Sequence, residues 1–271
     1  MGPTKHARAT KQATPAKQAT PAKQATPAKQ ATPAKQASST GRASGTERTS
    51  PTKPPSQDPH AYDAEPYLPS RGGLSAHRRA AADCRGCPLH EGATQTVFGK
   101  GNESARLLLV GEQPGDQEDR QGEPFVGPAG RLLRRALDEA GIDMDTAYVT
   151  NAVKHFKFTR PPGGGKRRIH KAPDLHEVAA CRPWLLAELR LVRPEVVVAL
   201  GATAGKALLG SSFRVTKDRG ALLPMPDDQG SYVVATLHPS AVLRADDREG
   251  AYAGLVSDLK VAAEALAKSE P

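Results

Sequence analysis

Four short apolar runs, separated by stretches with helical periodicity, constrain the fold of this chain more than any other feature. Each run has four to six residues and is rich in Val, Leu and Ala, as in strands that are buried on both faces. The runs cover residues 107–110, 147–150, 196–200 and 232–237. Helical patterns cover residues 130–140, 174–191, 202–209 and 248–268. This alternation predicts an α/β domain in which a parallel sheet carries helices on both faces.

The first 75 residues do not share this pattern. Between Lys11 and Lys35 the unit Lys-Gln-Ala-Thr-Pro-Ala recurs every six residues, without an aromatic residue, Val, Ile or Leu. Such a segment cannot bury enough apolar surface to offset chain entropy, and its regular prolines forbid a continuous helix. We therefore expect a disordered basic tail over residues 1–75 and one folded domain over residues 76–271.

Charge is concentrated in the predicted tail. Residues 1–75 hold eleven Lys or Arg against four Asp or Glu, a net charge of +7, whereas the whole chain carries +9. Evenly spaced lysines suit salt-dependent contact with a polyanion such as DNA. The alternative is a solubilising linker or an extension without a function.

Targeting signals and cysteines limit the cellular setting. No apolar run approaches the roughly 20 residues of a membrane span, and the N-terminus lacks the apolar core of a secretory signal. We therefore expect a soluble, cytoplasmic protein without a membrane partner. Three cysteines, two of them in Cys84-Arg85-Gly86-Cys87, argue against a disulfide framework and for a metal site. The Cys84–Cys87 spacing is shared by zinc and iron–sulfur sites, and His90 is a candidate fourth ligand.

Three polar motifs lie next to the predicted strands. Residues 111–115 read Gly-Glu-Gln-Pro-Gly after the first run, residues 165–170 read Gly-Lys-Arg-Arg-Ile-His, and residues 238–240 read His-Pro-Ser after the last run. The first motif is neither a dinucleotide-binding nor a P-loop pattern, but its glycines and proline predict a tight loop that a ligand can approach closely. Open α/β sheets build their sites at strand ends. A carboxylate, two imidazoles and a group of cations there suit the cleavage of a bond next to phosphate.

Five motifs follow one another along the chain, namely residues 111–115, 124–130 (Pro-Phe-Val-Gly-Pro-Ala-Gly), 150–156 (Thr-Asn-Ala-Val-Lys-His-Phe), 166–170 and 238–240. In order and spacing they resemble the UdgX group of the uracil-DNA glycosylase superfamily. The resemblance runs from about Cys84 to the last helix, and the tail lies outside it. It implies a three-layer α/β/α sandwich with a central four-stranded parallel sheet. It also implies a nucleoid-associated, monomeric DNA-repair enzyme that acts on uracil-containing DNA, single-stranded DNA being favoured because no base pair must be broken.

The chemistry assigns the residues to the two sides of the scissile bond. Cleavage between uracil and deoxyribose passes through an oxocarbenium-like sugar while negative charge develops on the base. A carboxylate therefore suits the sugar side, where we place Glu112, and a hydrogen-bond donor suits the base side, where we place His238. The nucleotide must be flipped out of a duplex, and the resemblance gives the stacking and edge-reading roles to Phe125 and Asn151. Three further polar residues of these loops are predicted to contact the substrate: Gln113, Asp116 and Ser240.

The resemblance implies that His170 attacks the anomeric carbon in place of water, with Glu112 taking up or orienting the proton on its other ring nitrogen. The product would join the protein to C1′ of the abasic sugar, and it should not turn over because an N-alkylated imidazole is a poor leaving group. From the residues alone, the loop with Lys166, Arg167 and Arg168 suits phosphate binding, with the histidine as one more donor. The alternatives are a conventional turnover glycosylase and a catalytically silent DNA-binding module.

The cysteines complete the expected site list. Related glycosylases with a four-iron cluster have a fourth cysteine where this chain has a histidine. The resemblance therefore implies a [4Fe-4S] cluster held by Cys84, Cys87, His155 and Cys181, with zinc as the alternative metal. In either case the metal is expected to be structural.

Overall fold

The computed structural model describes residue 2 and residues 62–163, 165–226 and 230–268. Every helix and strand of the described residues lies within the unit Pro54–Pro271. Most of the predicted tail lies outside the described residues, but its end does not. Ala64 is buried and its amide donates a hydrogen bond to the Ala180 carbonyl at 3.0 Å, and Leu74 is also buried. The folded part therefore includes residues 62–75, ahead of the predicted boundary.

The sheet has six strands in the order β1-β3-β2-β6-β8-β7. The four predicted apolar runs form its parallel centre, namely β2 (Leu107–Gly111), β3 (Tyr148–Asn151), β6 (Val196–Leu200) and β8 (Tyr232–Thr236). Two short strands pair antiparallel at the edges, namely β1 (Lys100–Gly101) and β7 (Leu222–Pro224). The predicted four-stranded parallel sheet is thus the centre of a mixed sheet, and the α/β class is confirmed.

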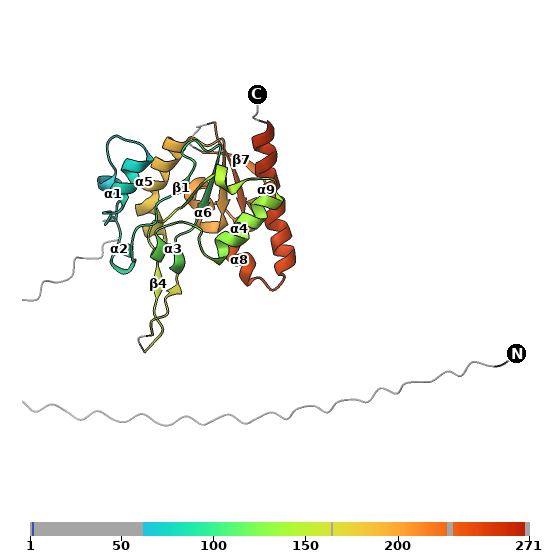
Figure 1. The fold of residues 1–271 in the computed structure, drawn as a ribbon, viewed down its shortest axis with the longest axis horizontal. Coiled ribbons are helices and arrows are strands. Elements are labelled where there is room, and N and C mark those ends of the chain that lie inside the picture. The colour runs from blue at the N-terminus through green and yellow to red at the C-terminus, as the bar shows by residue number, and fades with distance from the viewer. Residues whose placement is uncertain (1, 3–61, 164, 227–229, 269–271) are drawn as a thin grey trace, which may run out of the picture. The chain divides into compact units, whose positions relative to one another are not determined.

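Alternating side chains of the central strands build two cores. Leu107 and Leu109 of β2 belong to one buried cluster, whereas Leu108 and Val110 belong to the other. The first cluster is closed by α4 (Pro128–Glu139) and α9 (Arg248–Lys268). The second is closed by α5 (Leu175–Val192) and α6 (Gly201–Leu209). Figure 1 shows α4 and α9 on one side of the sheet and α5 on the other, so the expected three layers are present.

Shorter elements complete the domain. They are η2 (Glu65–Tyr67), α1 (Leu74–Ala81), α2 (Leu89–Gly92), α3 (Asp116–Gln121), η3 (Met144–Thr146), α7 (Val215–Asp218) and α8 (Pro239–Arg244). A separate antiparallel hairpin pairs β4 (Phe158–Thr159) with β5 (Ile169–His170) and projects away from the sheet (Figure 1). No helix in the described ranges is long and apolar enough to cross a membrane.

The strand register gathers the motif loops at the carboxyl ends of the parallel strands. Gly111 of β2 pairs with Asn151 of β3, and Leu200 of β6 pairs with Thr236 of β8. Because these strands are parallel and end together, the residues that follow them lie side by side. The fold therefore brings Glu112, Asn151 and His238 to one place.

Candidate active site

A pocket of about 190 Å³ lies at the carboxyl ends of the parallel strands. The segments that line it come from the ends of β2, β3, β5, β6 and β8, from the loop before α4, and from α3, α4, α6 and α8. Seven residues predicted to act on substrate line it: Glu112, Gln113, Phe125, Asn151, His170, His238 and Ser240. The structure therefore brings together the residues assigned to both sides of the scissile bond.

Glu112 and His170 meet on the side of this pocket where we expect the sugar. The Glu112 Oε1 atom lies 3.5 Å from His170 Nε2, and the exposed fractions of the two side chains are 23% and 50%. The second carboxylate oxygen, Oε2, accepts a hydrogen bond from the Thr203 hydroxyl. The imidazole is thus accessible from solvent and close to a negative charge, which would stabilise a cation formed on the ring or on a nearby sugar.

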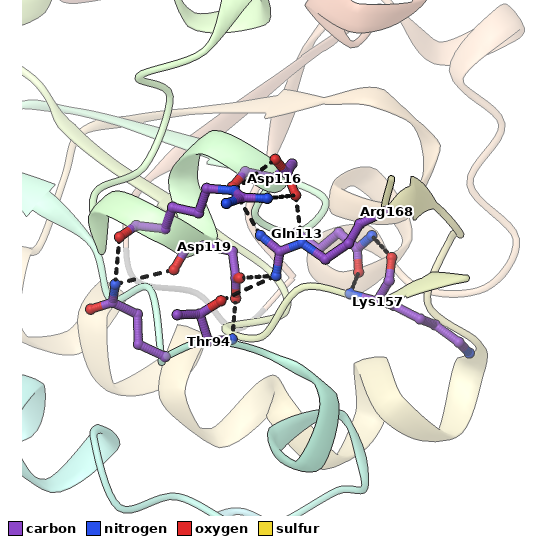
Figure 2. Close-up of polar contacts among 8 residues, drawn as sticks. Thr94, Gln113, Asp116, Asp119, Lys157 and Arg168 are labelled. Atoms are coloured by element: carbon purple, nitrogen blue, oxygen red, sulfur yellow. Dashed lines mark hydrogen bonds and ion pairs between the residues drawn. The ribbon is translucent and has the colours of Figure 1, made fainter. Parts of the chain in front are cut away.

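Gln113 fixes the hairpin that carries this histidine. Its Oε1 atom accepts a hydrogen bond from the Lys157 amide at 3.0 Å, and its Nε2 atom donates to the carbonyls of Lys157 and Lys171 at 3.2 and 3.0 Å. The same Nε2 atom lies 2.9 Å from His170 Nε2. Figure 2 shows Gln113 facing Lys157 across this junction. Gln113 lines the pocket as predicted, but its amide is also hydrogen-bonded to the backbone at both ends of the hairpin, at Lys157 before β4 and at Lys171 after β5.

These contacts bear on the proton assignment of His170. The two hydrogens of Gln113 Nε2 face three neighbours, the Lys157 and Lys171 carbonyls and His170 Nε2, so the contact with the ring is compatible with either neutral tautomer. Glu112 also approaches Nε2. Glu112 therefore lies beside Nε2 in this geometry, and its role in taking up or orienting a proton of His170 stays a prediction.

Arg168 does not have the exposed position of a phosphate ligand. Its Nε atom lies 2.5 Å from Asp116 Oδ1, its Nη1 atom lies 2.5 Å from Asp119 Oδ2, and Nη1 also donates to the Thr94 hydroxyl at 3.1 Å. Figure 2 shows the guanidinium enclosed by these groups, and only 7% of the side chain is exposed. The phosphate-binding prediction for Arg168 is corrected, because its donors are already used to tie the hairpin to α3.

Asp116 and the remaining loop cations have different positions. The Asp116 carboxylate is bonded to Arg168 and to Arg120, the latter at 2.9 Å, and Asp116 is absent from the pocket lining. Although burial raises its pKa, these two arginines outweigh burial and hold the pKa below the ordinary value. The expected substrate contact of Asp116 is therefore replaced by a structural one. Lys166 and Arg167 are exposed near the hairpin tip, and their phosphate role remains a prediction.

Phe125 forms one wall of the pocket, on the side where we expect the base. Its backbone has φ +57°, unusual for an aromatic residue, and its ring stacks on the His238 ring with centroids 6.1 Å apart and planes at 30°. A Cβ atom on Gly111 would lie 2.7 Å from the Phe125 ring and would also strike the Asn151 amide oxygen. Glycine at position 111 is therefore required for the ring and the amide to approach the strand end together.

Asn151 is held from behind by a buried ion pair. The residue is 2% exposed, and its backbone carbonyl accepts a hydrogen bond of 2.7 Å from Lys154 Nζ. That ammonium lies 2.5 Å from Glu188 Oε2, with side chains 1% and 0% exposed. The Thr150 hydroxyl joins the same network, at 2.7 Å from Nζ. Sequence reasoning missed this network, because Glu188 lies in a distant helix and carries no motif.

His238 has the protonation state that a neutral donor needs. The Ser240 amide donates to His238 Nδ1 at 3.1 Å, and the Ser240 hydroxyl lies 2.8 Å from the same atom. Burial, with the nearby charges of His170 and Arg244, lowers the pKa of His238 to about 4. The ring is therefore neutral near pH 7, with its one proton on Nε2 and free to donate. Ser240 orients this histidine as well as lining the pocket.

The three cysteines are buried in one core cluster. The Trp184 indole nitrogen donates to Cys84 Sγ at 3.3 Å, and the Lys154 amide donates to Cys181 Sγ at 3.3 Å. Burial raises the pKa of Cys87 to about 11 and that of Cys181 to about 12, and each thiol is close enough to the others for their charges to interact. Soft thiol donors in a hydrophobic shell fit an iron–sulfur or zinc site.

His155 has a ring nitrogen suited to a fourth ligand. The Thr96 hydroxyl donates to the Ala81 carbonyl at 2.8 Å, so its 2.9 Å contact with His155 Nε2 requires that nitrogen to donate and leaves a lone pair on Nδ1. Burial lowers the pKa of His155 to about 4. The competing His90 contacts the Cys87 carbonyl through Nδ1 at 2.7 Å. Within the described residues, however, no three His, Cys, Asp or Glu are gathered closely enough to hold a metal ion.

Comparison with known proteins finds one matching family and several relatives. The family model of the uracil DNA glycosylase superfamily matches residues 98–260. The chain is 43% identical to a Type-4 uracil-DNA glycosylase of Thermotoga maritima over 162 residues, 59% of this chain and 78% of that protein. It is 34% identical to the Type-4 uracil-DNA glycosylase of Archaeoglobus fulgidus over 198 residues, 71% of this chain and 93% of that protein. A Type-5 uracil-DNA glycosylase of Pyrobaculum aerophilum is 33% identical over 158 residues, 52% of this chain and 63% of that protein.

Proposed function

The chain belongs to the uracil-DNA glycosylase superfamily, and from that premise we propose that it excises uracil from DNA and then retains the abasic strand through a covalent bond to His170. The first part follows the names of its relatives, and the second follows the resemblance of residues 166–170 to the UdgX group. The observation that carries the second part is the position of His170. It lies in the substrate pocket, half exposed, with Nε2 3.5 Å from Glu112 Oε1.

The residues divide the reaction into two steps. As the glycosidic bond breaks, its electron pair moves to uracil, and the neutral His238 donates from Nε2 to the base oxygen where charge develops. Glu112 stabilises the oxocarbenium-like sugar that remains. The Nε2 lone pair of His170 then forms the new bond to C1′, and the ring loses its Nδ1 proton to solvent. Phe125 stacks on the flipped base and Asn151 reads its edge.

DNA would approach the pocket beside the projecting hairpin. Lys166 and Arg167 are exposed there, whereas Arg168 is turned inward, so we assign the phosphate contacts of this loop to the first two residues. Single-stranded DNA is the favoured substrate because its bases need no unpairing. The basic segment 1–75 adds salt-dependent affinity on this proposal, through its sequence charge of +7.

A metal centre fits the donor chemistry of the buried cysteines. We propose that Cys84, Cys87, Cys181 and the Nδ1 atom of His155 hold a [4Fe-4S] cluster, with zinc as the alternative. The group would supply a cross-link between the start and the middle of the domain. The Thr96 contact supports His155 as a ligand, because metal-binding histidines commonly donate their other ring N–H to a protein acceptor.

A conventional turnover glycosylase is the second candidate. The names of the relatives favour it, since they are called uracil-DNA glycosylases without mention of an adduct. The half-exposed position of His170 would also let water reach the sugar if the ring turned away.

One experiment separates the candidates. The protein is incubated with a single-stranded oligonucleotide containing one uracil, and the products are run on a denaturing gel beside a thymine control. We expect a band that survives heat and detergent, that forms only with uracil, and that disappears in a His170→Ser variant. Release of many uracils per protein molecule without such a band would establish the turnover reaction instead.

A further inference from the structure

The carboxylate of Glu112 is shared between two partners on opposite sides. Its Oε1 atom faces His170, while its Oε2 atom accepts a hydrogen bond from Thr203 Oγ1. In the described part of the chain, Thr203 is the only residue hydrogen-bonded to this carboxylate. The hydroxyl therefore determines which oxygen remains available to the candidate nucleophile.

The fold explains why this hydroxyl lies where it does. Thr203 is the third residue of α6, which begins directly after β6, and β6 pairs in parallel with β2, the strand that leads into Glu112. Gly201, at the start of the helix, has φ +89°, and a Cβ atom there would lie 2.9 Å from His238 Cβ. The first turn of α6 is thus wedged between the two residues that act on opposite sides of the scissile bond.

Thr203 is outside the pocket lining even though its predecessors are inside it. Leu200, Gly201 and Ala202 line the pocket, whereas Thr203 does not. A β-branched side chain in a helix has few χ1 rotamers, so its hydroxyl direction is well defined. Any effect of this hydroxyl on catalysis must therefore pass through Glu112 rather than through contact with the base.

We propose that Thr203 is a positioning residue for the reaction, holding the Glu112 carboxylate so that Oε1 faces the sugar and His170. The inference rests on the proposed uracil excision at this pocket. A hydrogen bond to a charged group is among the stronger ones in proteins. Its loss from an otherwise intact pocket should reduce the excision rate about tenfold to a hundredfold. Substrate binding should be unaffected.

The test compares three variants in single-turnover excision of uracil from a labelled single-stranded oligonucleotide, with DNA affinity measured separately by anisotropy. Thr203→Val keeps the branched shape and removes the hydroxyl, so it should slow excision at saturating protein and leave affinity unchanged. Thr203→Ser keeps the hydroxyl and should restore the rate. The matched control is Thr146→Val, which removes the hydroxyl that Thr146 donates to the Asp143 carbonyl in η3, and it should match the wild type.

A double variant separates positioning from general structure. In a Glu112→Gln background the Thr203→Val change should lose most of its effect, because the carboxylate it positions is gone. The inference would be overturned if the Thr203→Val variant excised uracil as fast as the wild type. It would also be overturned if Thr203→Val and Thr203→Ser lowered the excision rate equally, or if the effects of Thr203→Val and Glu112→Gln on the rate were additive. Absence of excision by the wild type would instead overturn the proposed function itself.

Discussion

Replacing Lys154 with Met tests how strongly the buried ion pair behind Asn151 stabilises the domain. The pair is almost fully enclosed, with exposed fractions of 1% and 0%, and Nζ lies 2.5 Å from Glu188 Oε2. Removing the ammonium leaves the carboxylate buried without its counter-charge, a loss that costs about 3–5 kcal/mol. Glu188 keeps hydrogen bonds from the Gly99 amide and the Tyr148 hydroxyl, at 2.9 and 3.1 Å. We therefore expect the lower end, about 3 kcal/mol.

Urea unfolding at pH 7 measures this loss. The matched control is Arg134→Met, which removes the ion pair between Arg134 and Asp145, whose side chains are 50% and 76% exposed. Such a surface pair contributes about 0–1 kcal/mol, so the control should unfold close to the wild type. Lys154→Met combined with Glu188→Leu should recover part of the loss, because no unpaired charge remains. If Lys154→Met costs no more than the surface control, the assignment of a stabilising buried charge pair is refuted.

Three further predictions concern pH, the hairpin and the metal. The pKa of His238 is lowered to about 4 from an ordinary 6.5, so as pH falls the unfolded chain takes up a proton at this residue before the folded chain does. The free energy of unfolding should therefore drop by about 3 kcal/mol between roughly pH 6.5 and 4. In urea titrations over this pH range, a His238→Gln variant should lose about 3 kcal/mol less than the wild type. Arg168→Ala should lower the stability of the domain and slow adduct formation. Arg167→Ala should instead weaken DNA binding and flatten its salt dependence, as followed by anisotropy. The reverse pattern would contradict the positions given to these two residues. Purified protein should contain iron and sulfide and absorb visible light. A Cys181→Ala variant should lose the iron–sulfur content and the visible absorption. A colourless wild type with one bound zinc would show that the metal is zinc instead.

The sequence predicted the central strands and long helices because their signals are local. The apolar runs that became β2 and β6 are buried on both faces, as their composition indicated. The edge strand β1 has only two residues, both exposed, and exists because it pairs with β3. A pairing of that kind has no local signature. The domain start was also misplaced, since Ala64 is buried by a contact with Ala180, far away in sequence.

The site shows the same limit at the level of side chains. The pocket residues Glu112, Asn151 and His238 could be grouped because each follows a predicted strand. Arg168 could not be told from its neighbours, since a row of cations does not indicate which one points inward. The direction of the Arg168 side chain is set by Asp116 and Asp119 of α3. These two residues precede Arg168 by about 50 positions, and no spacing rule connects them to it.

The contact between Trp184 and Cys84 gives the protein a built-in optical reporter. Trp184 is the only tryptophan of the chain, it is fully buried, and its indole nitrogen donates to the Cys84 sulfur at 3.3 Å. All tryptophan emission therefore originates beside the cysteine core. A bound iron centre would quench that emission, whereas unfolding would expose the indole and shift its emission to the red. Occupancy of the core and integrity of the fold can thus be followed on one unlabelled sample.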